Sequence, residues 1–453
     1  MNLPIARQFA DFAAARATVP SDVTHAANRA ILDTLGAMIA GGAHQTTLAA
    51  RRAVARGPGA ATLATGGTAE PTAAALVNGT AAHAWDIDDT SYTGIMHGSA
   101  VILPAILAVA EDVGADTATM QHAFVAGSEI AYTLADLCTH DHYFRGWWST
   151  VTFGLIGATA AVSVVLGLTP DQASAAISLA AAGAGGGKSV FGTDAKPVLA
   201  GEAARRAIDF AYLARAGITA PATAFEDDRG FLALLNARKA DLTALQTLGQ
   251  TWRLVAPGLL FKTNPVCSAA HAAIDQMQAL MTTLGAEADD IASIRADVPD
   301  LVYISLVYPD PATPQEAQFS LPYALACVAL NGRVRFEDLT LGAIQCPEKV
   351  ALMRLVTTHK ARDLSTEAMR ARYPESARLK VTLKDGRSAE GFTGSALGMP
   401  DNPQSDAALL TKFETACAYA GRSGPIEAKL GDNPAATLAR LIRRASPQQR
   451  RLS

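Results

Sequence analysis

The chain has 453 residues, a formal net charge of −4, 49% hydrophobic residues and only 6% aromatic residues. Apart from a basic tail at residues 440–451, interpreted as a solvated end, lysine and arginine are scattered. Without the basic patch that a phosphate backbone needs, we expect no nucleic-acid partner. The length predicts two domains, and because alanine dominates and favours helices, we expect mainly closely packed helices.

The cysteines predict neither a disulfide framework nor structural zinc. They are odd in number and far apart, without CxxC spacing. The first 17 residues carry charge throughout, unlike a signal peptide, and the most apolar run, 154–168, is too short to span a membrane. These features predict a soluble, cytoplasmic protein without membrane association. The five cysteines are Cys138, Cys267, Cys327, Cys346 and Cys417.

Apolar periodicity and capping residues predict a helical first half. Asp22 is expected to cap the second helix, and Gly41-Gly42 to end it. A helix beginning near Ser99 has Pro104 early in it, where a missing N–H costs little. The other expected helices cover residues 4–17, 22–40, 46–55, 71–84, 117–138, 151–166, 170–181 and 199–215, with an extended piece at 61–65.

Residues 81–110 place a dense group of polar side chains between apolar helices. A spacing of three and four residues would put His83, Asp86 and Thr90 on one face of a helix that Gly94 ends. Charged groups are costly in an apolar core unless they have a partner or a use, so this stretch is typical of a buried reaction site. Its polar groups are His83, Asp86, Asp88, Asp89, Thr90 and His97.

A glycine-rich run at residues 182–188, AGAGGGK, invites comparison with a phosphate-binding loop. The GxxxxGK frame fails because its first position is Ala182, and no strand precedes the run. We therefore interpret the glycines as allowing close helix packing or a mobile loop near the site.

From about Leu259 the pattern changes to mixed helix and strand. Strand-like stretches occur at 291–298 and 302–307, and Asp385-Gly386 is the turn of a predicted hairpin, 379–392. Helices are expected at 268–284, 321–330, 405–418 and 426–445. The fold class is therefore mainly α. An α+β lid domain of residues 265–395 is inserted into a helical domain formed by residues 1–264 and 396–453.

Six segments in this order and spacing resemble the MmgE/PrpD family, over roughly residues 5–445. That family includes 2-methylcitrate dehydratase, cis-aconitate decarboxylase and iminodisuccinate epimerase. The resemblance implies a homodimer with no metal or organic cofactor, acting on a small-molecule carboxylate. The segments are residues 78–90, 97–111, 145–161, 196–208, 258–275 and 319–332.

The resemblance also implies roles for individual residues. Lys196 and Lys262 would clamp substrate carboxylates, and His97, which titrates near neutral pH, would transfer the proton. Asp86 would tune His97 or act as the base itself, and Tyr323 would close over the substrate from the lid. Further expected substrate contacts are Thr90, Asp89, Trp148, Thr150, Cys267 and His271.

Structural alternatives remain for these residues. The lysines would ordinarily lie at the surface, His97 could bond backbone in a loop, and Tyr323 could pack in a core. Asp88 and Asp89 could instead brace their loop. His83 and His271, on helices, are as readily structural as functional.

The chain departs from the family pattern at three positions. Trp148 stands where many members have histidine, Leu199 stands where a KxxH motif would have one, and Cys267 replaces the histidine of cis-aconitate decarboxylases. Losing a proton donor argues against a decarboxylase that relies on the histidine replaced by Trp148. It also favours a smaller or less polar substrate than a tricarboxylate.

These considerations give a leading hypothesis of a cofactor-independent lyase or isomerase that abstracts a proton next to a carboxylate. A hydro-lyase like 2-methylcitrate dehydratase comes first, then an epimerase or isomerase, then a decarboxylase. A magnesium-dependent lyase of the terpene-synthase kind would fit the DIDDT motif of residues 86–90, but a second metal motif and lining aromatics are missing. A non-catalytic paralogue that only binds a ligand is the remaining alternative.

Overall fold

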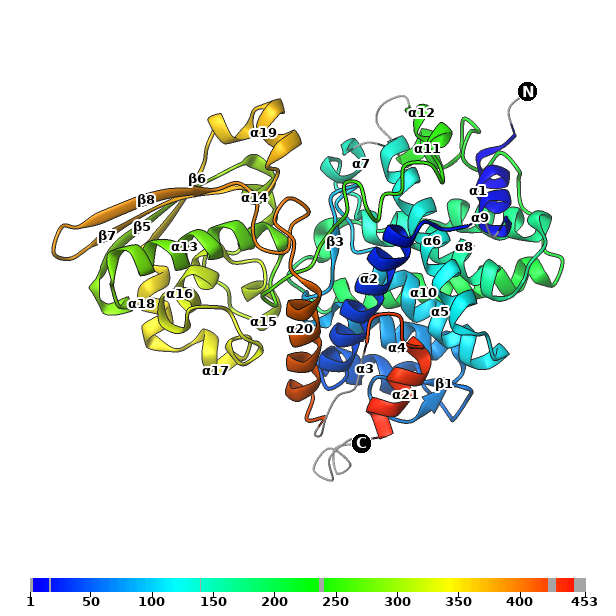
Figure 1. Cartoon of the computed structure of the whole chain (residues 1–453), viewed down its shortest axis with the longest axis horizontal. Helices are drawn as coiled ribbons and strands as arrows, with labels where there is room; N and C mark the ends of the chain where they lie inside the picture. Colours follow the sequence, from blue (N-terminus) through cyan, green and yellow to red (C-terminus); the bar gives the residue numbers. More distant parts are fainter. Residues whose placement is uncertain (1–2, 16–17, 139, 236–239, 423–428, 444–453) are drawn as a thin grey trace.

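The computed structural model describes residues 3–15, 18–138, 140–235, 240–422 and 429–443. The molecule is 58% helical with only 9% strand, which confirms the predicted mainly-α class. Figure 1 shows two units side by side, joined near α20. We call residues 265–399 the smaller unit and the rest of the described chain the larger unit.

The larger unit is a bundle of helices with two short antiparallel strand pairs, β1 with β2 and β3 with β4. The N-terminal and C-terminal helices lie in it together, because α2 packs against both α20 and α21. Its helices are α1 (Ile5–Ala14), α2 (Ser21–Gly41), α3 (Gln45–Val54), α4 (Pro71–Ala84), α5 (Ser99–Val113), α6 (Thr117–Cys138), α7 (Asp141–Phe144), α8 (Ser149–Val165), α9 (Pro170–Gly183), α10 (Ala195–Arg215), α11 (Phe231–Leu235), α12 (Thr243–Gln246), α20 (Asp406–Tyr419) and α21 (Pro434–Arg443). Its strands are β1 (Ala61–Thr62), β2 (Thr68–Ala69), β3 (Thr90–Ser91) and β4 (Leu259–Leu260).

The smaller unit is a four-stranded sheet with helices packed on it. Its strand order is β6-β5-β7-β8, with β5 and β6 parallel and the other neighbours antiparallel. Helix α13 packs on β7 and β8. The strands are β5 (Ile291–Val298), β6 (Val356–Lys360), β7 (Ala377–Leu383) and β8 (Ser388–Thr393). The helices are α13 (His271–Leu284), α14 (Asp300–Ser305), α15 (Pro314–Ala317), α16 (Leu321–Asn331), α17 (Leu341–Ile344), α18 (Pro347–Met353) and α19 (Glu367–Arg372).

Each unit has its own hydrophobic core. The first core gathers apolar side chains of α1–α10 together with Leu409, Phe413 and Leu438 from the C-terminal helices. The second gathers those of the smaller unit and takes in Trp85 and Ala416 from the larger one. Helix α20 thus contributes to both cores. The predicted domain boundaries at residues 264 and 396 stay predictions.

Several predictions of local structure were wrong. Asp22 lies inside the first turn of α2 and Pro104 lies in the interior of α5. Residues 300–305 form helix α14 rather than a strand, because Pro299 and Asp300 begin a helix there. The exposed edge strand β6 was missed, since its sequence VTTHK has no apolar alternation.

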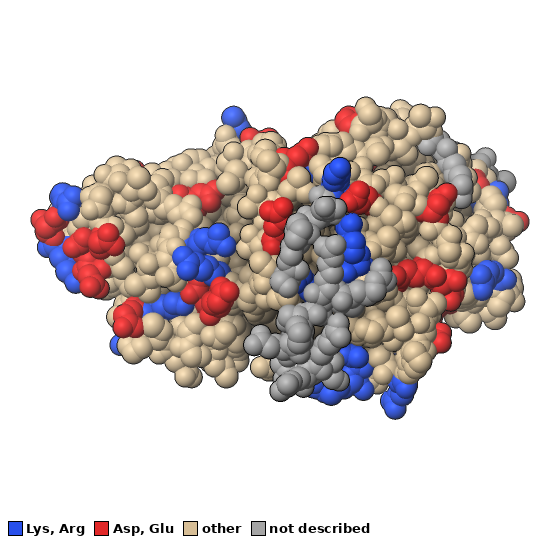
Figure 2. Space-filling model, turned by 60° about the horizontal axis from the view of Figure 1, so that its bottom comes forward, with Lys and Arg blue, Asp and Glu red and all other residues tan. Residues whose placement is uncertain are grey.

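The surface and the helix lengths bear on partners. On the face in Figure 2, basic and acidic side chains are interspersed rather than gathered by sign. Among the described helices, none combines the length and apolarity that a bilayer crossing requires. The predicted absence of a nucleic-acid partner, the cytoplasmic location and the homodimer stay predictions.

Helices α4 and α10 cross with their backbones in contact. A Cβ atom on Gly79 would lie 2.7 Å from the Gly201 Cα, and one on Gly201 would lie 2.1 Å from the Leu76 carbonyl oxygen. Only glycine fits such an approach. The crossing brings Lys196, in the first turn of α10, to His83, in the last turn of α4.

Replacing Gly201 by alanine is expected to lower the free energy of unfolding by about 2 kcal/mol, because the new methyl group meets backbone that cannot rotate away. Urea unfolding at pH 7 measures this. The matched control is Gly342→Ala on α17, where no atom lies within 4 Å of the new Cβ and stability is expected to hold or rise. Equal losses in the two variants would contradict the close crossing.

Candidate active site

The two units meet around a narrow cavity with an interior volume of about 20 Å³. This is room for about one water molecule and lies well below the volume of small-molecule sites, so its walls have to move apart to admit a ligand. The larger unit contributes Asp86, Thr90, Ile95, His97, Tyr143, Trp148, Phe191 and Lys196 to its lining. The smaller unit contributes Cys267, Ser268, Ser305, Phe319 and Glu375.

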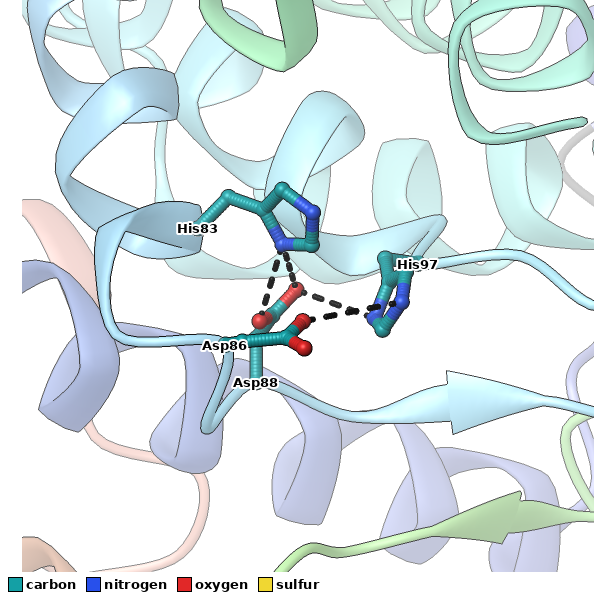
Figure 3. A group of neighbouring side chains, drawn as sticks. All are labelled: His83, Asp86, Asp88 and His97. Carbon is teal, nitrogen blue, oxygen red and sulfur yellow. Dashed lines mark hydrogen bonds and ion pairs between the residues drawn. The ribbon is translucent and has the colours of Figure 1, made fainter. Parts of the chain in front are cut away.

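Four titratable side chains, His83, Asp86, Asp88 and His97, form the cluster in Figure 3. Two of them, Asp86 and His97, line the cavity. Asp88 accepts a hydrogen bond from His83 Nδ1 at 2.9 Å and lies 3.4 Å from His97 Nδ1. His97 Nε2 lies 3.9 Å from Asp86 Oδ1. The chain folds this way because α4 ends at Ala84 and Asp86 adopts a left-handed φ of 50°. The prediction that His83, Asp86 and Thr90 share a helical face was therefore wrong. Asp86 and Thr90 line the cavity, and His83 contacts it only through Lys196.

Two buried lysines converge on Asp86. Lys196 Nζ lies 2.9 Å and Lys262 Nζ lies 3.0 Å from Asp86 Oδ1, and Lys262 also donates to the Asp86 carbonyl oxygen at 2.8 Å. Both lysines are buried, so the surface alternative does not hold for them. Burial alone would raise the pKa of Asp86, but the two ammonium groups outweigh it and hold this pKa below its ordinary value. Asp86 is thus ionised and joins both lysines.

The hydrogen bonds fix the tautomers of both histidines. His97 Nδ1 lies 2.9 Å from the Asp89 carbonyl oxygen, which only accepts, so Nδ1 carries the hydrogen and Nε2 the free lone pair. His83 Nε2 lies 2.6 Å from Lys196 Nζ, which only donates, so the hydrogen of His83 is on Nδ1 toward Asp88. Burial lowers the pKa of His83 to about 4, and it lowers the pKa of His97 although Asp88 opposes this. Both imidazoles are neutral near pH 7.

The same four residues offer donor atoms within 4.8 Å of one another, as a divalent-cation site would. However, the ammonium of Lys196 lies against both Asp86 and His83, and that of Lys262 lies against Asp86. A metal ion would have to displace these cations. The arrangement therefore fits acid–base chemistry better than metal ligation, and the absence of a metal or organic cofactor stays a prediction.

A second ion pair braces the loop behind this wall. Lys412 of α20 donates to Asp33 Oδ1 at 2.5 Å and to the Ile87 carbonyl oxygen at 2.7 Å. The carboxyl group of Asp89, fully buried beside this pair, has its pKa raised by burial and by Asp33. Asp89 thus contributes its carbonyl oxygen to His97, and not its carboxyl group to the cavity. Its predicted substrate contact was wrong.

The other predicted residues divide into lining and supporting groups. Thr90, Trp148 and Cys267 line the cavity, and burial raises the pKa of the Cys267 thiol to about 12. Thr150 does not line it; its hydroxyl oxygen accepts a 3.0 Å hydrogen bond from the His97 backbone N–H. Thr150 therefore positions His97.

Two predicted residues lie elsewhere. Tyr323, on the apolar helix α16, is buried in the smaller core, where its hydroxyl donates to the Asp338 carbonyl and lies 3.2 Å from Lys349 Nζ. Its predicted role in closing over the substrate was wrong, and the core alternative holds. His271 Nε2 accepts from the Asn264 backbone N–H at 3.3 Å, and burial lowers the pKa of His271 to about 3. His271 therefore stabilises the turn in which it lies and does not contact the cavity.

Of the wall contributed by the smaller unit, sequence reasoning named Cys267 and missed the other residues. Glu375 accepts hydrogen bonds of 2.8 Å from both Tyr92 and Ser268. Burial raises the pKa of Glu375, although those two bonds oppose this. Glu375 precedes β7 in an irregular segment, where no periodicity or spacing marks it. Nothing in the sequence, apart from their apolar character, marked Phe191 and Phe319 as residues of the cavity.

Known proteins show similarity to this chain along most of its length. Cis-aconitate decarboxylase of Mus musculus is 27% identical over 358 residues, covering 76% of this chain and 71% of its own length. The Homo sapiens protein of the same name is 27% identical over 356 residues, covering 76% and 72%. That of Aspergillus terreus is 24% identical over 374 residues, covering 76% and 74%.

Family models match both parts of the chain. The MmgE/PrpD N-terminal domain matches residues 7–242, and the MmgE/PrpD C-terminal domain matches residues 265–428. Together these matches cover most of the sequence, including every residue that lines the cavity. Lys262, which pairs with Asp86 behind the lining, lies between the two matches. The chain therefore belongs to the MmgE/PrpD family.

Proposed function

We propose that this protein is a cofactor-independent hydro-lyase that removes water from a small hydroxy acid. The observation that carries the proposal is His97. Its imidazole is neutral, its Nδ1 hydrogen is held by the Asp89 carbonyl, and its free Nε2 lies at the cavity wall beside Asp86 and Lys196. A fixed neutral imidazole with one free lone pair is the form that a general base requires.

The reaction would begin with proton removal. Lys196 binds the substrate carboxylate, and His97 Nε2 takes the proton from the adjacent carbon. Charge that develops on the carboxylate is stabilised by the Lys196 ammonium, which the buried site strengthens. Trp148 and Phe191, on the same side of the cavity, exclude water from this step.

The second half needs an acid for the departing hydroxide, and the opposite wall offers one. Glu375, with its raised pKa, holds Ser268 at 2.8 Å, and both line the cavity. Once Glu375 is protonated, the Ser268 hydroxyl turns from donor to acceptor toward it and donates its own hydrogen to the leaving oxygen. A proton thus passes from Glu375 through Ser268, and the leaving oxygen departs as water while the carbon–carbon double bond forms. A base on one wall and an acid on the other are what an elimination requires.

Proton NMR in deuterated water, with a panel of 3-hydroxy acids, tests this function. Solvent deuterium in the C–H next to the carboxylate, together with formation of the unsaturated acid, is expected. Deuterium exchange without loss of water would contradict the hydro-lyase proposal and indicate an epimerase or isomerase instead. No exchange with any acid would favour the non-catalytic alternative.

A second candidate is a decarboxylase, which the names of the curated relatives favour. Here the bond to a carboxylate breaks, carbon dioxide leaves, and the acid wall returns a proton to carbon. Carbon dioxide release from unsaturated acids, measured in parallel with water loss from hydroxy acids, separates the two. Trp148 argues against a decarboxylase that needs a histidine at this position.

The pH dependence follows from the buried state of His97. Burial lowers the pKa of His97 from its ordinary 6.5, with Asp88 opposing. Because only the neutral imidazole accepts a proton, activity is lost as pH falls through this lowered pKa and is retained above it. The acidic limb of the kcat/KM profile is therefore expected to have its midpoint below pH 6.5. A midpoint at or above that value would assign the limb to another group.

A further inference from the structure

We infer that the natural substrate is a hydroxy acid with a single carboxylate, at its reacting end, and an apolar group at its other end. This inference rests on the proposed function and deepens it.

The fixed charges at the reacting wall cancel. Asp86 and Asp88 are ionised, and Lys196 and Lys262 carry the opposing charges within one buried cluster. The neutral His83 and His97 add none. A substrate with three carboxylates would therefore enter a site without net positive charge, and each carboxylate that stayed unpaired would lose its hydration without compensation.

The lysine donors are also nearly used up. Lys196 has three N–H groups, of which one goes to Asp86 and one to His83, so a single charged donor remains for a ligand. Lys262 donates twice to Asp86, is fully buried, and is not among the lining residues. Among the described residues, the cavity thus offers one ammonium donor, enough for one carboxylate.

The path to that donor is aromatic. Lys196 Nζ lies 5.2 Å from the ring centroid of Phe319, 5.5 Å from that of Phe191 and 5.6 Å from that of Trp148. The rings of Phe191 and Phe319 stack with centroids 5.3 Å apart. Contact between these ring faces and an apolar group is favourable, because it removes apolar surface from water. The same faces offer a second carboxylate neither a hydrogen-bond donor nor a positive charge.

Within the part of the chain that the structure describes, the groups next to the cavity do not supply a second anion site. Lys188, a nearby cation, lies over the Tyr143 ring with Nζ 3.6 Å from its centroid and does not line the cavity. Burial lowers the pKa of Lys188 to about 8, which weakens its charge further. On the opposite wall, Glu375 would repel a distal carboxylate whenever it ionised.

The decisive experiment uses the wild-type protein and three 3-hydroxy acids that share one reacting end. Their distal groups are a branched alkyl chain, one carboxylate, and two carboxylates. The alkyl acid is expected to show a kcat/KM at least 10-fold above the second acid and at least 100-fold above the third. A tricarboxylate processed as fast as the alkyl acid would overturn the inference and leave the hydro-lyase proposal standing.

Binding is measured separately by thermal shift, so that the two proposals fail in different ways. If no acid exchanges deuterium but the alkyl acid alone stabilises the protein, the substrate class holds and the hydro-lyase proposal fails. If the tricarboxylate stabilises it most, the substrate class fails whatever the catalytic result. Lys188→Met provides a control, since the preference among the three acids is expected to stay unchanged.

Trp148→His tests the aromatic wall by a single substitution. Trp148 is buried, stacks on His83 with ring centroids 5.6 Å apart, and closes one side of the path to Lys196. A smaller ring with a hydrogen-bond donor is expected to shift the ratio of kcat/KM values at least 10-fold toward the acid with one distal carboxylate. The matched control is Trp147→His, one residue away and outside the cavity lining. Unchanged ratios in Trp148→His would contradict the role given to this wall.

Discussion

Replacing His97 by glutamine is expected to lower kcat by about 10²–10⁴-fold, the range that a positioned general base contributes. Glutamine keeps a polar side chain of similar length, so the wall formed by Asp86 and Thr90 keeps its shape. It cannot accept the proton, because its amide nitrogen has no free lone pair. Deuterium exchange and steady-state kinetics measure the loss, and circular dichroism confirms that the helical fold is retained.

The matched control is His122→Gln on α6, where the histidine lies outside the cavity and contacts the Ala13 carbonyl oxygen at 3.2 Å. This variant is expected to keep wild-type kcat. If His97→Gln retained more than a tenth of the wild-type rate, His97 would not be the base. Asp86 would then be the next candidate, since its carboxylate lies at the same wall.

Replacing Asp86 by asparagine is expected to lower the free energy of unfolding by about 3–5 kcal/mol, because it leaves two buried ammonium groups without their shared carboxylate. Asparagine tolerates the left-handed conformation at this position, so the loss reports the charge rather than the backbone. Chemical unfolding at pH 7 measures it. Activity is expected to fall as well, because Lys196 loses the group that holds it beside His83.

Two further variants isolate the cause of that loss. Asp11→Asn removes the carboxylate of an exposed pair with Arg7 and is expected to cost under about 1 kcal/mol. Adding Lys262→Met to Asp86→Asn removes one of the unpaired cations and is expected to restore part of the stability. A loss in Asp86→Asn no larger than in Asp11→Asn would contradict the buried cluster.

Local sequence patterns predicted much of the secondary structure. Periodic apolar residues predicted the helices from α1 to α10 to within a few residues, except the short helix α7, which was missed. Asp385-Gly386 marked the β7–β8 hairpin. The pairing of β3 with β4 joins Thr90 to Leu260, and no local pattern encodes a contact between segments so far apart. The left-handed turn at Asp86 was equally hidden, because a helical spacing of polar residues masked it.

The residues of the candidate site were likewise predicted only in part. Polar density in an apolar region indicated Asp86 and His97, and family resemblance added Lys196 and Lys262 from distant segments. Resemblance failed for Tyr323, because a motif gives a residue's place in the chain but not the direction in which its helix turns it. Glu375 could not be found, since its importance comes only from where the smaller unit folds back onto the larger one.

The ion pair of Lys412 with Asp33 and its hydrogen bond to the Ile87 carbonyl oxygen have a consequence for synthesis of the protein. Lys412 and Ile87 are 325 positions apart, and Asp33 is made earlier still. At ordinary ribosomal speeds, on the order of half a minute separates the first of these groups from their cation. During that time the carboxyl group of Asp33 is without the ammonium group of Lys412. The loop at Ile87 therefore gains this brace only after Lys412 of α20 has been made.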